Sequence, residues 1–222
     1  LVACIILTTV FASIAGFFMA KYKMHPFIST MANMLIIFGL VTYATKGVSF
    51  GAIESSIPNM FIPNLGGFPT IIIWAVVAII VVWFIWNKTT FGKNLYAVGG
   101  NPEAASVSGI SVFKVTMGAF ILAGILYGFG SWLESNRMVG SGSAAYGQGW
   151  DMDAIAACVV GGVSFTGGIG KISGVVTGVL IFTSLTYSLT ILGIDTNLQF
   201  IFEGIIILAA VTLDCLKYVQ KK

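Results

Sequence analysis

The sequence predicts an all-α protein, a polytopic bundle of transmembrane helices with about seven membrane segments. Hydrophobic residues make up 57% of the chain and charged residues 9%, and the mean hydropathy is +0.98. Soluble domains carry about a quarter charged residues. The apolar residues form runs of about 17 to 25, the length that a helix needs to cross the hydrocarbon core of a bilayer. Short alternating segments, typical of a transmembrane β-barrel, are not the pattern here.

Seven apolar runs are long enough to be considered as membrane segments. In chain order they are Val2–Ala20, Ile28–Thr45, Thr70–Trp86, Val115–Leu133, Ala154–Ile169, Gly174–Leu192 and Leu198–Leu216. The run Ala154–Ile169 is short, rich in glycine and interrupted by Ser164 and Thr166, so it is read as a full crossing, a half-membrane re-entrant helix or a broken helix. Since the chain begins inside an apolar run at Leu1, without a basic segment before it, we expect residues 1–222 to be the C-terminal portion of a longer polytopic membrane protein.

The lysine and arginine residues indicate how the helices are oriented, because basic loops are retained on the cytoplasmic side. If Ala154–Ile169 crosses the membrane, one side holds nine of the eleven basic residues, and the other holds Lys46 and Arg137. The nine are Lys21, Lys23, Lys88, Lys93, Lys114, Lys171, Lys217, Lys221 and Lys222. This bias favours a full crossing, a cytoplasmic C-terminus and a cytoplasmic loop over residues 88–114.

The same composition argues against several classes of function. We attribute the net charge of +3 to membrane topology. The basic residues form no stripe interleaved with aromatic residues, so we expect no nucleic-acid partner. The three cysteines are single residues in apolar runs, and the one histidine, His25, precedes Pro26, so neither a metal site nor a catalytic residue is predicted. Charged residues are scarce inside the helices, whereas transporters driven by ion gradients need such groups near the midplane. Energy for uphill transport would then come from outside the chain. A secondary transporter or channel for small polar solutes stays open as the alternative.

The polar stretch from Asn87 to Lys114 is more elaborate than a tether between two membrane helices requires. Asn101 is a strong N-cap residue, Pro102 suits the first helical position, and Glu103 favours the positive end of the helix dipole. Gly109 ends the helix, which is predicted over Pro102–Ser108. Gly99 and Gly100 would permit a sharp entry into it. Small side chains permit close approach of another protein: Ala104, Ala105, Ser106 and Ser108.

Glycines spaced four residues apart indicate close packing between helices. Gly124 and Gly128 form one such set, and Gly170, Gly174 and Gly178 form another. Each set lies on one face of a helix and lets a neighbouring backbone approach. We interpret both sets as packing seams, and a role in helix sliding during transport is the functional alternative.

Three stretches of the chain resemble a known family. They are residues 91–110, which include Gly-Gly-Asn-Pro-Glu-Ala-Ala at 99–105, residues 154–170, and residues 213–218. The chain is similar there to the permease subunits of bacterial ABC sugar importers of the ribose, xylose and galactose group, and most similar to the galactose and methyl-galactoside branch.

The resemblance implies a multi-pass protein of the bacterial inner membrane that works as a dimer with a second permease copy. It implies two further partners, a periplasmic sugar-binding protein and an ABC ATPase subunit, with ATP and Mg bound on the ATPase and no cofactor in this chain. Matched by position, the ATPase-coupling element is Gly99, Gly100, Asn101, Pro102, Glu103, Ala104, Ala105, Ser108 and Gly109. Many relatives carry a basic residue at the position of Ser106. Serine has no charge, so the resemblance does not imply a salt bridge from this position to the ATPase.

A sugar pathway should offer hydroxyl partners without binding tightly. The candidate lining residues are Thr30, Asn33, Ser164, Thr166, Gln199 and Glu203. Glu203 is the ionisable residue well inside a predicted helix, and such a group faces a partner, a water-filled cavity or the membrane interface. The outer loops, with Pro58, Pro63 and Pro69 in one and residues 134–153 in the other, are the predicted docking face for the binding protein.

Overall fold

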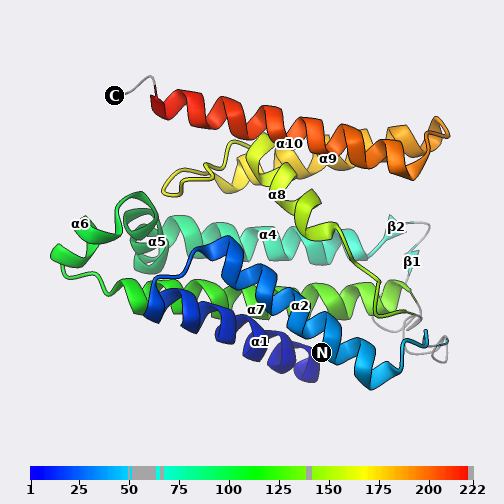
Figure 1. Ribbon diagram of the computed structural model, residues 1–222, viewed down its shortest axis with the longest axis horizontal. Coiled ribbons are helices and arrows are strands. Elements are labelled where there is room, and N and C mark those ends of the chain that lie inside the picture. Colours follow the sequence, from blue (N-terminus) through cyan, green and yellow to red (C-terminus); the bar gives the residue numbers. More distant parts are fainter. Residues whose placement is uncertain (50, 52–63, 66–67, 139–141, 220–222) are drawn as a thin grey trace. The chain divides into compact units, whose positions relative to one another are not determined.

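The computed structural model describes residues 1–49, 51, 64–65, 68–138 and 142–219 (Figure 1). The described residues are dominated by α-helices, as predicted. The helices are α1 (Val2–Tyr22), α2 (Pro26–Thr45), α4 (Ile71–Lys88), α5 (Thr90–Gly100), α6 (Pro102–Val107), α7 (Val112–Arg137), α8 (Trp150–Val160), α9 (Ile172–Ile191) and α10 (Thr196–Val219). A short antiparallel ladder joins β1 (Asn64–Leu65) to β2 (Phe68–Pro69). Of the predicted outer-loop residues, Pro58 and Pro63 lie outside the described residues, as do Lys221 and Lys222.

Five helices are long and apolar enough to cross a membrane. They are α1, α2, α4, α7 and α9, and α10 contains a shorter apolar stretch over Asn197–Thr212. Their bounds agree with the predicted segments to within about one helical turn, the usual uncertainty of helix ends. The prediction of a transmembrane helix bundle is therefore confirmed.

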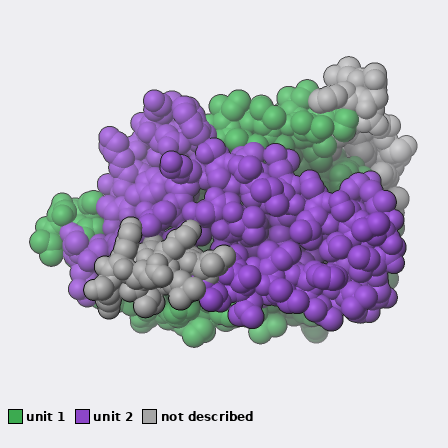
Figure 2. Space-filling view, turned by 90° about the horizontal axis from the view of Figure 1, so that it is seen from above, with its two compact units in different colours: residues 1–81, 105–146 green, residues 82–104, 147–222 purple. Residues whose placement is uncertain are grey.

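The chain divides into two compact units, each built from two separate stretches of sequence (Figure 2). Unit 1 comprises Leu1–Val81 and Ala105–Tyr146, and unit 2 comprises Val82–Ala104 and Gly147–Lys222. Both α4 and α6 are divided between the units, and the chain passes between the units a third time in the turn at residues 146 and 147.

In unit 1, α1 packs antiparallel to α7 through the predicted glycine seam. A Cβ atom on Gly128 would lie 2.5 Å from the Cα of Ile5, and one on Gly124 would lie 2.6 Å from the Cα of Thr9. The Thr8 hydroxyl donates a hydrogen bond of 2.8 Å to the carbonyl of Gly124. Backbones that approach this closely leave no room for a side chain, so the packing role predicted for Gly124 and Gly128 is confirmed.

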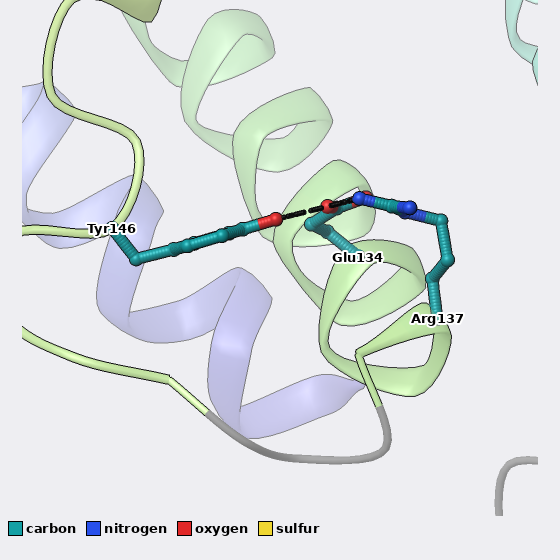
Figure 3. A network of polar contacts seen from close by, with 3 residues as sticks. All are labelled: Glu134, Arg137 and Tyr146. Atoms are coloured by element: carbon teal, nitrogen blue, oxygen red, sulfur yellow. Dashed lines mark hydrogen bonds and ion pairs between the residues drawn. The ribbon is translucent and has the colours of Figure 1, made fainter. Parts of the chain in front are cut away.

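The end of α7 is tied to the segment that follows it by a small polar network (Figure 3). The Arg137 Nε donates to the Glu134 carboxylate over 2.9 Å, and the Tyr146 hydroxyl donates to the same carboxylate. This hydrogen bond to Glu134 raises the pKa of the Tyr146 hydroxyl, because the neutral phenol is the form that donates. Tyr146 is therefore held against the last turn of α7.

In unit 2, α8, α9 and α10 form two consecutive antiparallel hairpins. A Cβ atom on Gly174 would lie 2.2 Å from the Gly161 carbonyl oxygen, and one on Gly178 would lie 2.1 Å from that of Ala157. The predicted packing role is therefore confirmed for Gly174 and Gly178. Gly170 does not belong to this helix face, because it precedes α9, and a Cβ atom there would meet the Val163 side chain at 3.2 Å. Phe182 of α9 is buried with Ala157, and Ile207 of α10 packs against this cluster.

The segment Ala154–Ile169, for which three readings were open, is not one continuous helix, and the reading as a short or broken helix agrees with the structure. α8 begins four residues earlier, at Trp150, and ends at Val160. Its 11 residues give a length of about 16 Å, about half the hydrocarbon thickness. Residues 161–171 form a non-helical loop in which Gly162, Gly167 and Gly168 have φ of +82°, +95° and +72°. Glycine adopts this left-handed conformation without steric cost, so the glycines counted within the predicted helix are the residues that end it.

Candidate coupling site

The polar stretch 88–114 folds into two short helices in place of a loop with one helix. The Thr89 hydroxyl caps α5 by accepting a hydrogen bond of 3.3 Å from the Gly92 amide. Gly99 and Gly100 were predicted to permit a sharp entry, but they are the last two residues of α5. The change of direction occurs at Asn101, which is extended with φ of −156° and ψ of 101°. The reason is that α5 continues its hydrogen bonding as far as the Asn101 amide, which donates to the Ala97 carbonyl over 3.1 Å.

The predicted caps of α6 are confirmed in detail. The Asn101 side-chain oxygen accepts hydrogen bonds of 3.0 Å from the amides of Glu103 and Ala104. Pro102 is the first residue of the helix. Gly109 has φ of +82°, and the Ile110 amide donates back to the Ala105 carbonyl over 3.0 Å. The helix ends at Val107, one residue before the predicted end at Ser108.

The surface of α6 combines one buried small residue with an exposed apolar one. Ala105 is 4% exposed, whereas Val107 is 89% exposed. The exposed residues of the coupling element also include Pro102, Glu103, Ala104 and Ser108. Val107 lies three positions after Ala104, so both occupy neighbouring positions on the helix surface. Val107 is not among the residues predicted from sequence, although an apolar residue in a polar stretch is a usable indication of a contact surface.

Within unit 2, the end of α5 makes a backbone-to-backbone contact with the loop 161–171. A Cβ atom on Gly99 would lie 2.7 Å from the Gly168 amide nitrogen, and one on Gly168 would lie 2.6 Å from the Cα of Gly100. A Cβ atom on Gly167 would lie 2.7 Å from the Gly99 carbonyl oxygen. The two Gly-Gly pairs, which are far apart in the sequence, therefore form one contact.

A hydrogen bond reinforces this contact. The half-buried Tyr96 of α5 donates from its hydroxyl to the Gly170 carbonyl over 2.6 Å, two residues before α9 begins. Tyr96 could not be selected from the sequence, because its partner is 74 residues away in the chain.

A cavity of about 700 Å³ adjoins the contact within unit 2. It lies between the last turns of α4, α5 and the beginning of α9, and its lining includes Trp83, Asn87, Tyr96, Lys171 and Thr177. The end of α4 and the beginning of α9 are thus at the same end of unit 2, and α10 runs back toward that end because it is antiparallel to α9.

Three of the four predicted pathway residues of unit 2 make hydrogen bonds within a loop or a turn. Ser164 is buried, and its hydroxyl lies 2.9 Å from that of Thr166 inside the loop 161–171. Gln199 accepts from the Thr190 hydroxyl over 3.4 Å and donates to the Ile194 carbonyl over 3.0 Å, bracing the turn between α9 and α10. Glu203 is half-buried on α10.

The other two predicted pathway residues are on α2, in unit 1. Thr30 is exposed, and its hydroxyl bonds back to the Pro26 carbonyl over 3.0 Å. Asn33 is half-buried. The six candidates are thus divided between the units, and their role in a pathway stays a prediction. The described residues contain no group of three or more His, Cys, Asp or Glu side chains that could hold a metal ion.

A family model described as "Branched-chain amino acid transport system / permease component" matches residues 1–211. The chain belongs to this permease family. Curated relatives of the permease include the galactose/methyl galactoside import permease protein of Treponema pallidum, which is 54% identical over 221 residues, covering 96% of this chain and 41% of the relative. The protein of the same name from Escherichia coli is 44% identical over 230 residues, covering all of this chain and 68% of the relative.

More distant relatives of the permease carry other sugar names. The ribose import permease protein of Bacillus subtilis is 37% identical over 204 residues, covering 90% of this chain and 62% of the relative. The permease chain spans 41%, 63% and 68% of the length of the first three relatives. No solved structure matches it significantly.

Proposed function

We propose that this permease is the membrane-spanning subunit of an ATP-driven importer for a monosaccharide of the galactose or methyl galactoside type. The relatives named for that substrate are 54% and 44% identical to this chain, against 38% for an L-arabinose permease and 37% for a ribose permease. The higher identity favours the galactose type over the other two sugars.

The main support for an ATP-driven importer is helix α6, which is exposed and capped at both ends. An apolar side chain on a helix that spans the membrane can face lipid, but α6 lies in a polar stretch, where Val107 at 89% exposure has no such explanation. A short rigid helix with one exposed apolar side chain and small neighbours fits a groove on another protein. The partner would be an ABC ATPase that binds ATP and Mg itself.

The remaining partners and the orientation follow from the same proposal. Residues 88–114 and the C-terminus face the cytoplasm of a bacterial cell, in line with the distribution of lysines and with α5 and the end of α10 lying toward the same end of unit 2. A periplasmic sugar-binding protein delivers the sugar on the other side, and a second copy of the permease completes the assembly. The energy comes from ATP hydrolysis outside this chain, and this chain converts it into movement of membrane helices.

Uptake by reconstituted liposomes tests this proposal. The full-length permease is inserted with its ATPase, and labelled galactose is offered with the binding protein outside and ATP inside. We expect uptake only when ATP and the binding protein are both present. Uptake that is the same without ATP would contradict the proposal and favour a secondary transporter or channel, and the absence of uptake under all conditions would contradict it as well.

A further inference from the structure

We propose that Gly99, Gly168 and Tyr96 form a rigid joint that transmits movement of α5 and α6 to the hairpin of α8 and α9. The inference rests on the proposed function, because it concerns what happens after an ATPase has docked on α6. Tyr96 and the two glycines are positioning residues in this account, since they act on membrane helices through the backbone.

The joint is made of backbone. Gly99 meets Gly168 so closely that a Cβ atom on either residue would overlap the other segment of chain, at 2.7 and 2.6 Å. Contacts between flexible side chains absorb small displacements by changing rotamer, but a contact between two backbones does not have that freedom. A displacement of the end of α5 toward the loop 161–171 therefore displaces the loop.

Tyr96 resists displacement in the opposite direction. Its hydroxyl donates to the Gly170 carbonyl over 2.6 Å. A backbone contact alone resists only the approach of α5 to the loop 161–171. A hydrogen bond of this length also resists their separation. Together they hold α5 at a fixed distance from the residues that lead into α9.

The loop is itself stiff enough to carry the movement onward. The Ser164 amide donates to the Ile169 carbonyl over 3.0 Å, and the Ser164 hydroxyl lies 2.9 Å from that of Thr166. The ends of the loop belong to helices held in contact at Gly161 and Gly174. The loop, α8 and the beginning of α9 consequently move as one body, with Ser164 and Thr166 bracing the loop.

The test separates coupling from assembly by measuring three quantities in the reconstituted complex. These are the amount of ATPase that copurifies with the permease, the rate of ATP hydrolysis with binding protein and galactose present, and the number of galactose molecules taken up per ATP hydrolysed. Tyr96→Phe removes the hydroxyl and keeps the ring. Gly168→Ala inserts a Cβ atom into the contact.

Each variant has a matched control in the same unit. Gly162 has φ of +82° and nothing within 4 Å of the position that a Cβ atom would take, so Gly162→Ala carries a similar backbone strain without the overlap. Tyr187 of α9 is 67% exposed, so Tyr187→Phe removes a hydroxyl outside the joint. We expect both controls to retain the galactose-to-ATP ratio of the unchanged protein.

The expected result for Tyr96→Phe is unchanged copurification and hydrolysis with a galactose-to-ATP ratio lowered roughly twofold to tenfold, the range set by one lost hydrogen bond. Gly168→Ala should lower the ratio further. If the Gly168→Ala protein does not assemble with the ATPase, the galactose-to-ATP ratio of the Tyr96→Phe protein tests the joint alone. A Tyr96→Phe protein with an unchanged ratio, or one in which all three quantities fall together, would overturn the joint while leaving the proposed function intact. If the unchanged protein shows no ATP-dependent uptake, the proposed function fails and the joint fails with it.

Discussion

At the scale of single residues, Val107 distinguishes α6 from an ordinary connection. It is 89% exposed on a helix whose other side chains, apart from Pro102, are small or polar, and Ala105 on the same helix is buried. Burying a valine side chain contributes about 1.5 to 3 kcal/mol to an interface. An ATPase groove that receives α6 would gain most of its apolar contact from this residue.

Replacing Val107 with aspartate should weaken ATPase binding about tenfold or more, because the apolar contact is lost and a charge has to be desolvated. The measurement is the dissociation constant of the ATPase for the permease in lipid nanodiscs. Val48 follows α2 and is 65% exposed, on the side of the membrane predicted to be periplasmic, so Val48→Asp is the control and should leave the constant unchanged. Equal dissociation constants for both variants would exclude Val107 from the docking surface.

Local chemistry explains why the caps of α6 could be predicted from sequence. Asn101, Pro102 and Gly109 act within a few residues of their own positions, so their effect can be read in the sequence. Tyr96 and Gly168 act across a distance in the chain that sequence patterns do not encode. The contact between Gly99 and Gly168 became visible only when the fold brought α5 to the loop 161–171.

At the scale of elements, the packing of α7 on α1 depends on Gly128. A Cβ atom at this position would lie 2.5 Å from the Cα of Ile5, and backbone cannot move aside as a side chain can. Gly130, two residues further on, is exposed and has nothing within 4 Å of a Cβ position. The two glycines of one helix therefore differ in whether they tolerate a side chain.

Gly128→Leu should destabilise the protein by about 1 to 3 kcal/mol or more, the typical cost of overpacking, whereas Gly130→Leu should be close to neutral. The measurement is the temperature at which half of the detergent-solubilised protein loses its monodisperse elution peak. A lower midpoint for Gly128→Leu alone is the expected outcome. Equal midpoints for the two variants would mean that the seam between α1 and α7 does not support the fold.

The helices also show where the length of an apolar run stops predicting the bounds of a helix. Apolar run lengths located α1, α2, α4, α7 and α9 because each run is long and uninterrupted. The predicted segment began after the start of α8 and extended past its end, because the apolar residues continue through Gly161 and Gly162 while the helix ends at Val160. Asp151 and Asp153, expected in an outer loop, belong to the first turn of α8.

At the scale of the whole molecule, the two units are interleaved in sequence, and α6 is divided between them. The helix that we assign to ATPase docking is therefore continuous with both units. This is the arrangement expected of an element through which an external protein moves membrane helices. The sequence predicts that residues 1–222 form one transmembrane permease domain, and this stays a prediction. The family model matches residues 1–211, which include most of both units.

The central claim is that the ATPase docks on α6, and proximity crosslinking tests it most directly. The native cysteines are replaced, a single cysteine is introduced at the exposed Ala104, and the ATPase carries a short bifunctional maleimide reagent in the membrane-assembled complex. A cysteine at Val48 is the control. The account predicts a crosslinked permease–ATPase product for Ala104→Cys and none for Val48→Cys. No crosslink at Ala104 or at any other position from Asn101 to Ser108, in a complex that still hydrolyses ATP, would contradict the account.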